Sequence, residues 1–285
     1  MTDCLVGPPP APPSPGPISL TAADAIVCIN TEPRENPTGD AILLVTFGAN
    51  GNYIYLNNSG TLTATFAGIR ARTESNYSPI DIVNSGAIAV TADSFTGASG
   101  IQAVTYFNND SDISIVNTAD ITAYGGAGFG ISAAAYGQES SITLVNSGDV
   151  TVVGTEGRAT GIFSYTRYNA ATTIENRGDI QATTTSDYAD AFGILALTIG
   201  YAPISIVNSG DITVHAGEDA SGIRAFAGGP SSGITIENTG RITSTTDSKY
   251  ADGISAGTFG PASDIAILNQ GPIDAGHNAI IARSL

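Results

Sequence analysis

The sequence predicts an all-β fold: a right-handed parallel β-helix solenoid with three short strands per coil, about eight coils and an N-terminal cap. Three observations lead to this prediction. Close relatives of the stretch Ile204-Ser-Ile-Val-Asn-Ser-Gly-Asp-Ile-Thr-Val214 occur eight times, at spacings of 26 to 33 residues, which is a period typical of solenoids. Apolar residues alternate with polar ones on both sides of the central asparagine. A Gly-Ile pair then follows in almost every copy.

The first two strands of each repeat are predicted by this alternation. The residues two and four positions before the asparagine are apolar in almost every copy, as in Ile80 and Ile82. A period of two indicates a strand with one buried face. After the turn, the fourth residue is again apolar, and the copies are Leu62, Ile88, Ile121, Val150, Ile180, Ile212, Ile242 and Ile273. A second strand therefore follows a turn of constant length.

The third strand begins at the Gly-Ile pair, as in Gly161-Ile162 and Gly193-Ile194, which the last repeat replaces with Ala279-Ile280. No helical period lies between these strands, so each strand has only its equivalents in adjacent coils as pairing partners. The result is three parallel sheets around one core, and the rule for parallel crossovers predicts a right-handed winding.

The turn asparagine has the same parity as the two buried residues before it, so its side chain is expected to point inward. A buried amide needs hydrogen-bond partners. We therefore predict a ladder in which each asparagine bonds the backbone or the asparagine of the next coil. Its members are Asn58, Asn84, Asn117, Asn146, Asn176, Asn208, Asn238 and Asn269.

Three segments are expected along the 285 residues: a Pro-rich extended lead at 1–17, an N-terminal cap at 18–53 and the β-helix repeats at 54–285. The lead cannot join a ladder because proline lacks the N–H group. The cap contains apolar residues but lacks the Asn-Gly turn, as a terminal repeat that closes the core would. One elongated domain is predicted, since a solenoid grows linearly.

The charge balance excludes one class of partner. The chain has 26 acidic and 10 basic residues, a net charge of −16 and a single lysine, Lys249. Nucleic-acid binding needs clustered lysine and arginine, so it is not expected. No cofactor is expected either. The two histidines, His215 and His277, occupy different positions of their repeats and have no metal-ligand spacing.

The two cysteines, Cys4 and Cys28, both precede the first repeat. Either they are two unrelated thiols, or they form a disulfide that ties down the N-terminal segment, and the even count favours the disulfide.

The repeated Ile-x-[Ile/Leu]-x-Asn-x-Gly-x-Ile followed by Gly-Ile, with the cysteine pair and the Pro-rich lead, resembles the passenger region of bacterial autotransporters of the pertactin-like kind. The resemblance covers about residues 54–285 and is one of pattern. It implies export through the outer membrane of a Gram-negative bacterium and a place at the cell surface or outside the cell. It also implies a C-terminal outer-membrane β-barrel in the same polypeptide, which these residues do not contain, so we expect a piece of a longer protein.

Two sets of residues are candidates for a binding surface. Length varies only between the second and third strands, and five aspartates occur there: Asp187, Asp190, Asp219, Asp247 and Asp252. They could stack into an acidic strip that contacts Ca²⁺ or carbohydrate, or they could be the solvated edge of the loops. The second set is apolar and points outward from the third strands, comprising Phe163, Tyr165, Leu195, Leu197 and Phe226. These residues would bind sugar or protein, or be covered by connecting loops.

The predicted function is that of a surface-exposed or secreted autotransporter passenger fragment, acting as an adhesin or as an interaction or structural stalk. Its partner would be a protein or glycan of a host or a neighbouring cell. The alternative is a β-helical carbohydrate-active enzyme, a lyase or hydrolase, which needs several charged side chains converging on one outer face. No catalytic set can be assembled from the repeated positions, so we expect no enzyme.

Overall fold

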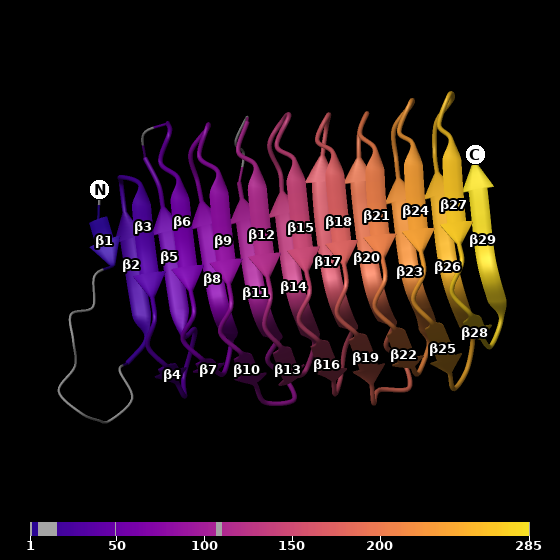
Figure 1. Ribbon diagram of the computed structural model, residues 1–285, viewed down its shortest axis with the longest axis horizontal. Helices are drawn as coiled ribbons and strands as arrows, with labels where there is room; N and C mark the ends of the chain where they lie inside the picture. The colour runs from indigo at the N-terminus through magenta and orange to yellow at the C-terminus, as the bar shows by residue number, and fades with distance from the viewer. Residues whose placement is uncertain (1, 5–15, 49, 107–109, 285) are drawn as a thin grey trace.

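A computed structural model describes residues 2–4, 16–48, 50–106 and 110–284, with only the backbone described for residues 2–4. These residues form a parallel β-solenoid with three sheets, and no helix occurs in the described chain. Figure 1 shows the coils side by side in chain order, so the two ends of the chain lie at opposite ends of the solenoid. The predicted fold class is confirmed.

Each sheet takes one strand from each coil. The first sheet contains β1 (Thr2–Cys4), β3 (Ile26–Asn30), β6 (Ile54–Asn58), β9 (Ile80–Asn84), β12 (Ile113–Asn117), β15 (Ile142–Asn146), β18 (Thr172–Asn176), β21 (Ile204–Asn208), β24 (Ile234–Asn238) and β27 (Ile265–Asn269). The second contains β4 (Arg34–Asn36), β7 (Leu62–Ala64), β10 (Ile88–Thr91), β13 (Ile121–Gly125), β16 (Val150–Gly154), β19 (Ile180–Thr184), β22 (Ile212–Ala216), β25 (Ile242–Thr246) and β28 (Ile273–Ala275).

The third sheet contains the longest strands. Its members are β2 (Ile18–Ala22), β5 (Ile42–Thr46), β8 (Ala67–Thr73), β11 (Ala98–Thr105), β14 (Gly128–Ala135), β17 (Ala159–Arg167), β20 (Ala191–Ile199), β23 (Asp219–Ala227), β26 (Tyr250–Thr258) and β29 (Asn278–Ser284). The segment 18–53, expected as a cap, contributes β2 to β5 and so continues the three sheets ahead of the predicted coils.

The asparagines form the predicted inward ladder. From Asn58 to Asn238 each is at most 1% exposed, and in each the Nδ2 group donates to Oδ1 of the next asparagine at 2.6–2.8 Å. The second N–H of the same amide donates to the backbone carbonyl two residues ahead, as from Asn146 to Gly148 at 2.7 Å. Every amide therefore points the same way along the solenoid.

The ladder begins one coil earlier than the sequence suggested. Asn30 donates to Oδ1 of Asn58 at 2.7 Å, and Nε of Arg34 donates to Oδ1 of Asn30 at 2.8 Å. Arg34 is only 5% exposed. Glu32 stands where seven of the eight predicted turns have glycine and one has Ala119, and Arg34 stands where all eight repeats have an apolar residue. These two departures hid the ninth asparagine. A guanidinium at the acceptor end of an aligned amide ladder supplies the donor that no earlier asparagine provides.

The Gly-Ile pairs have a steric explanation. A Cβ atom on Gly193 would lie 2.3 Å from Cγ2 of Ile212, on the second sheet, and 2.5 Å from the carbonyl oxygen of Gly222 in the next coil. Both distances are shorter than any allowed contact, so only glycine fits where the second and third sheets approach each other.

Two further hydrogen-bond ladders link neighbouring coils, one in the Asn turn and one in the turn between the third and first strands. On the exposed side of the Asn turn, Oδ1 of Asp149 accepts the N–H of Asp179 at 2.9 Å, and Asp179 accepts that of Asp211 at 2.8 Å. Between the third and first strands, Oγ of Ser111 accepts the N–H of Ser78, and Oγ of Ser140 accepts that of Ser111, both at 3.0 Å. These residues therefore link neighbouring coils at the turns.

The backbone register is consistent with the cysteine pair. Cys4 in β1 and Cys28 in β3 are Cα partners of adjacent parallel strands. Such strands lie about 4.7–4.9 Å apart, which is within the range of about 4.4–6.8 Å that a disulfide requires between Cα atoms. The disulfide stays a prediction, because the side chain of Cys4 is outside the described atoms.

Candidate functional site

The outer face of the third sheet carries the outward apolar residues in the predicted columns. Phe163 in β17 is the Cα partner of Leu195 in β20, and Tyr165 is the partner of Leu197. The same rows continue into β23 with Arg224 and Phe226. All these side chains alternate with inward residues such as Ile162 and Ser164, which are 0% exposed. The inward and outward faces are therefore those that the period of two indicated.

Two residues of this outer face are buried, and two arginine side chains lie over one of them. Leu195 is 3% exposed and Phe192 is 2% exposed, although neither belongs to the core cluster. The guanidinium of Arg158 lies 5.3 Å from the centre of the Phe192 ring, and that of Arg224 lies 5.6 Å from it. These are cation–π distances. Arg158 lies in the connection before β17, as the sequence had suggested for a covering residue, whereas Arg224 lies in β23.

A column of tyrosines lies near the ends of β11, β14 and β17. The rings of Tyr106 and Tyr136 are stacked with centroids 5.5 Å apart, and Tyr136 lies 5.3 Å from Tyr165. Arg72 lies 4.5 Å from the Tyr106 ring, and Nε of Arg167 donates to the Tyr165 hydroxyl at 2.9 Å. Burial raises the pKa of Tyr136, and the neighbouring tyrosines raise it further. Because these ring faces are used within the column, it presents ring edges and hydroxyls to a ligand.

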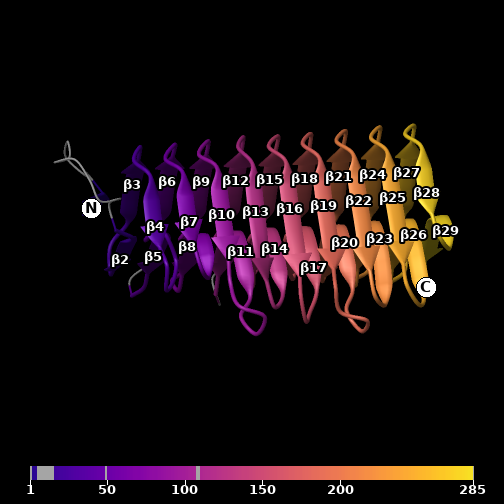
Figure 2. The same ribbon diagram turned by 90° about the horizontal axis from the view of Figure 1, so that it is seen from below.

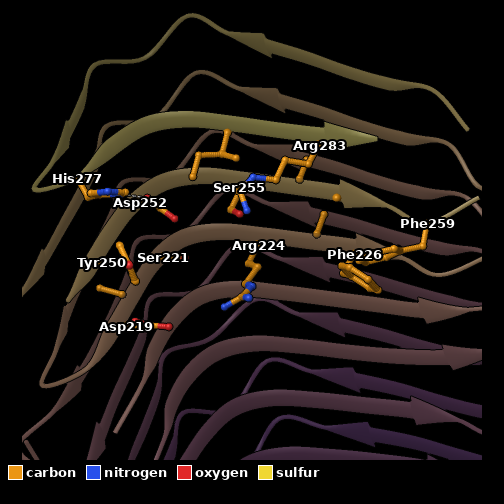
Figure 3. Close-up of a pocket in the computed structure, with 15 residues that line it drawn as sticks. Asp219, Ser221, Arg224, Phe226, Tyr250, Asp252, Ser255, Phe259, His277 and Arg283 are labelled. Atoms are coloured by element: carbon orange, nitrogen blue, oxygen red, sulfur yellow. Dashed lines mark hydrogen bonds and ion pairs between the residues drawn. The ribbon is translucent and has the colours of Figure 1, made fainter. Parts of the chain in front are cut away.

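A groove of about 670 Å³ lies on the outer face of the third sheet across β23, β26 and β29. Figure 3 shows three regions along it. Asp219, Tyr250, Asp252 and His277 lie at one end, Arg224, Ser255 and Arg283 in the middle, and Phe226 and Phe259 at the other end. The groove thus combines both signs of charge with aromatic rings, which is typical of a ligand site.

The acidic end is held together by side-chain contacts. Nδ1 of His277 lies 3.2 Å from Oδ1 of Asp252, and Nδ2 of Asn278 donates to the same oxygen at 2.9 Å. The Tyr250 ring meets the His277 ring edge-on, with centroids 4.8 Å apart. Tyr250 is 52% exposed, so part of this aromatic pair remains available for contact.

Asp219 is the most perturbed carboxylate of the groove. Burial raises its pKa, and the negative charge of Asp190 raises it further, while Lys249 and Arg224 lower it. Its Oδ1 atom is buried and has no hydrogen-bond partner among the described residues. A buried oxygen without a donor favours either protonation or a ligand that brings a hydroxyl group.

The five aspartates do not form the single strip that the sequence allowed. Asp190 and Asp219 occupy equivalent positions of adjacent coils, since each precedes the paired residues Ala191 and Ala220. Asp252 lies in another row, as the partner of Ser221. Asp187 is exposed in a turn, and Asp247 lies 3.5 Å from Nε2 of His215. The loops differ in length and so offset the aspartates from one another.

The aromatic end is built on a glycine. Gly257 in β26 is the partner of Phe226, and a Cβ atom at this position would contact the Phe226 ring at 3.4 Å. Phe226 also lies 4.7 Å from Phe259, which is 45% exposed. The Phe226 ring therefore lies next to Gly257, with Phe259 beside it. Phe226 was predicted from its outward parity, whereas nothing in the repeat singled out Phe259, because it follows the strand.

His277, Tyr250 and the two arginines of the groove were not predicted as site residues. His277 was taken as a surface residue because its sequence position matches no other histidine. The structure places it beside Asp252 because β26 and β29 pair with Asp252 opposite Asn278. Only the register across coils brings these residues together.

No group of three or more His, Cys, Asp or Glu side chains that could hold a metal ion occurs in the described part of the chain. None of its described segments is a helix that is long and apolar enough to cross a membrane. No protein-family model matches the chain, and searches of curated proteins and of solved structures found no significant match.

Proposed function

We propose that this chain is the β-helical passenger fragment of an autotransporter, displayed at the cell surface or released outside a Gram-negative cell, and that it acts as an adhesin or interaction stalk. The pattern of its repeats supports the passenger assignment, and the parallel β-solenoid is the fold that such a fragment needs. The proposed partners are proteins or glycans of a host or neighbouring cell. A C-terminal outer-membrane β-barrel of the same polypeptide would provide export.

Two observations carry the binding role: the groove on the third sheet and the exposed loops between the second and third strands of other coils. The connections between second and third strands lie along one edge of the solenoid, and those at 92–97 and 185–190 extend furthest from it (Figure 2). Their tips carry Phe95, which is 91% exposed, and Tyr188, which is 87% exposed. Exposed aromatic side chains are the residues that most often anchor a partner.

Glycan and host-protein arrays test this function. The wild-type chain is compared with a loop variant, Phe95→Ser with Tyr188→Ser, and a groove variant, Phe226→Ser. Tyr124→Ser is the matched control, because Tyr124 is 44% exposed and lies on the second sheet. The proposal expects specific binding that the loop or groove variant loses and the control keeps. Binding to no ligand, or equal loss in the control, would refute it.

The enzymatic alternative has one observation in its favour, the two carboxylates of the groove. Asp219 and Asp252 are offset by one coil and two residues, which corresponds to about 8 Å between Cα atoms. Carboxyl groups about 6.5–9.5 Å apart occur in inverting glycosidases. We propose binding without catalysis, because Asp252 already contacts His277 and Asn278. Release of reducing or unsaturated ends from polysaccharides, lost in Asp219→Asn and in Asp252→Asn, would establish the enzyme instead.

A further inference from the structure

The basic residues of this acidic chain are concentrated on one face. Seven of the ten lie on the outer face of the third sheet or directly before one of its strands: Arg70, Arg72, Arg158, Arg167, Arg224, Lys249 and Arg283. Four of these have an acidic partner, namely Arg70 with Asp40, Arg72 with Glu74, Arg158 with Asp190 and Lys249 with Glu218. Arg167 is hydrogen-bonded to Tyr165. Within the described residues, Arg224 and Arg283 make no ion pair, and both lie in the groove.

These two arginines come from the two strands, β23 and β29, that flank β26 in the groove. Arg224 and Ser255 are Cα partners in β23 and β26. Arg283 extends from β29, and Figure 3 shows its side chain running toward Ser255, above Arg224. The middle of the groove therefore holds the guanidinium of Arg283 beside the Ser255 hydroxyl, and the guanidinium of Arg224 lies further along, over the Phe192 ring. The planar fork of a guanidinium matches a carboxylate group, which it binds through two parallel hydrogen bonds.

The two ends of the groove restrict what else the ligand contains. Phe226 and Phe259 offer an apolar surface on one side of the arginines. On the other side, Oδ1 of Asp219 lacks a donor among the described residues, and Asp252 is a further acceptor. A ligand of this shape needs a carboxylate in the middle, C–H groups at one end and hydroxyl donors at the other. An acidic peptide would bring additional carboxylates close to Asp219 and Asp252, which like-charge repulsion opposes.

We propose that this groove binds a carboxylate-bearing sugar, with Arg283 holding the carboxylate, Arg224 adding a second positive charge along the groove, Asp219 accepting a hydroxyl and Phe226 contacting the C–H face of the ring. Uronic acids and sialic acids share this chemistry. The inference rests on the proposed binding function and specifies the ligand of the same groove. It assigns Arg224 and Arg283 as specificity-determining residues.

Two pairs of probes separate the charge from the shape of the sugar. Trigalacturonic acid is compared with its methyl ester, and sialyllactose with lactose, by calorimetry at physiological salt. The proposal expects one acid to bind at least ten times more tightly than its neutral counterpart. Which of the two acids binds distinguishes a uronic acid from a sialic acid.

The variants Arg224→Gln and Arg283→Gln should each weaken binding of that acid severalfold. The matched control is Arg241→Gln, which removes the same charge from an exposed arginine in the turn before β25. Arg283 and Arg241 are exposed, so thermal unfolding of these two variants should be unchanged and loss of binding is not loss of fold. Arg224→Gln also uncovers part of Phe192, so its binding is measured at a temperature where circular dichroism shows the solenoid intact.

Equal affinity for an acid and its neutral counterpart would overturn the proposal, as would an equal loss of binding in Arg241→Gln. If the arrays find a neutral glycan or a protein that requires Phe226, while neither acid binds, the carboxylate assignment is wrong and the adhesin function stands. If nothing on the arrays binds, both are wrong.

Discussion

Replacing Asn146 by alanine tests whether the asparagine ladder stabilises the solenoid. Asn146 is 0% exposed, accepts the amide of Asn117 at 2.7 Å and donates to Oδ1 of Asn176 at 2.8 Å and to the carbonyl of Gly148 at 2.7 Å. Alanine leaves one donor and two acceptors without these bonds, in a site that water does not reach. Leaving a buried polar group unsatisfied costs about 1–3 kcal/mol.

Counting only the two ladder neighbours, Asn117 and Asn176, the loss in the free energy of unfolding is about 2–6 kcal/mol. A loss near 3 kcal/mol would lower the thermal midpoint by roughly 6–12 °C for a chain of this size. The measurement is chemical and thermal unfolding followed by circular dichroism. Asn57→Ala is the matched control, because Asn57 is the neighbour of a ladder residue on the outward, half-buried side of β6, and its replacement should cost no more than about 0.5 kcal/mol.

Asn146→Asp separates hydrogen bonding from volume. An aspartate still accepts from Asn117, but an ionised one cannot donate to Asn176, and burial raises its pKa above the unfolded value. Ionising the buried aspartate at pH 7 therefore lowers the free energy of unfolding, and this loss disappears when the pH falls below the unfolded pKa. Relative to wild type, the variant should be more stable at pH 4 than at pH 7. The reasoning is refuted if Asn146→Ala is as stable as Asn57→Ala, or if Asn146→Asp shows no pH dependence beyond wild type.

Three further predictions use the turns and the groove. Gly193→Ala should lower the free energy of unfolding by about 1–3 kcal/mol through overpacking, since its Cβ would lie 2.3 Å from an isoleucine methyl. Gly97→Ala is the control in the same unfolding assay and should be tolerated, because the nearest atom to its Cβ would be 3.7 Å away. Asp219→Asn should be more stable than wild type at pH 7 and equal to it near pH 3, because the raised pKa of Asp219 penalises its ionised form; an unchanged difference across this range would contradict the assignment. Cys4 and Cys28 should be recovered as one disulfide-linked peptide from oxidised protein, and mass spectrometry that finds two free thiols would disprove the pairing.

The sequence by itself determined the fold, because the signals that specify a solenoid are local. The period of two around Asn208 specifies which side chains are inward, and the fixed turn sets the distance to the next strand. One such unit cannot bury Ile204 and Ile206 by itself, so the repeated units bury them by stacking coil on coil. The asparagine ladder and the columns that pair Phe163 with Leu195 followed from the same parity. Asn30 was the exception, since Arg34 follows it at the position where the other repeats have an apolar residue.

The tertiary structure decided what the outer face presents. The coils differ in length, so only the register across strands shows that Arg224 lies beside Ser255, or that Asp252 lies opposite Asn278 and next to His277. Exposure was likewise beyond the sequence. Phe192 has the outward position of an exposed aromatic, yet it is 2% exposed because two long arginine side chains from other coils lie over it. Backbone periodicity determines the face of the sheet from which a side chain projects. The atoms that cover it belong to residues about 30 positions away in the sequence, and the conformation of those long side chains depends on packing in three dimensions.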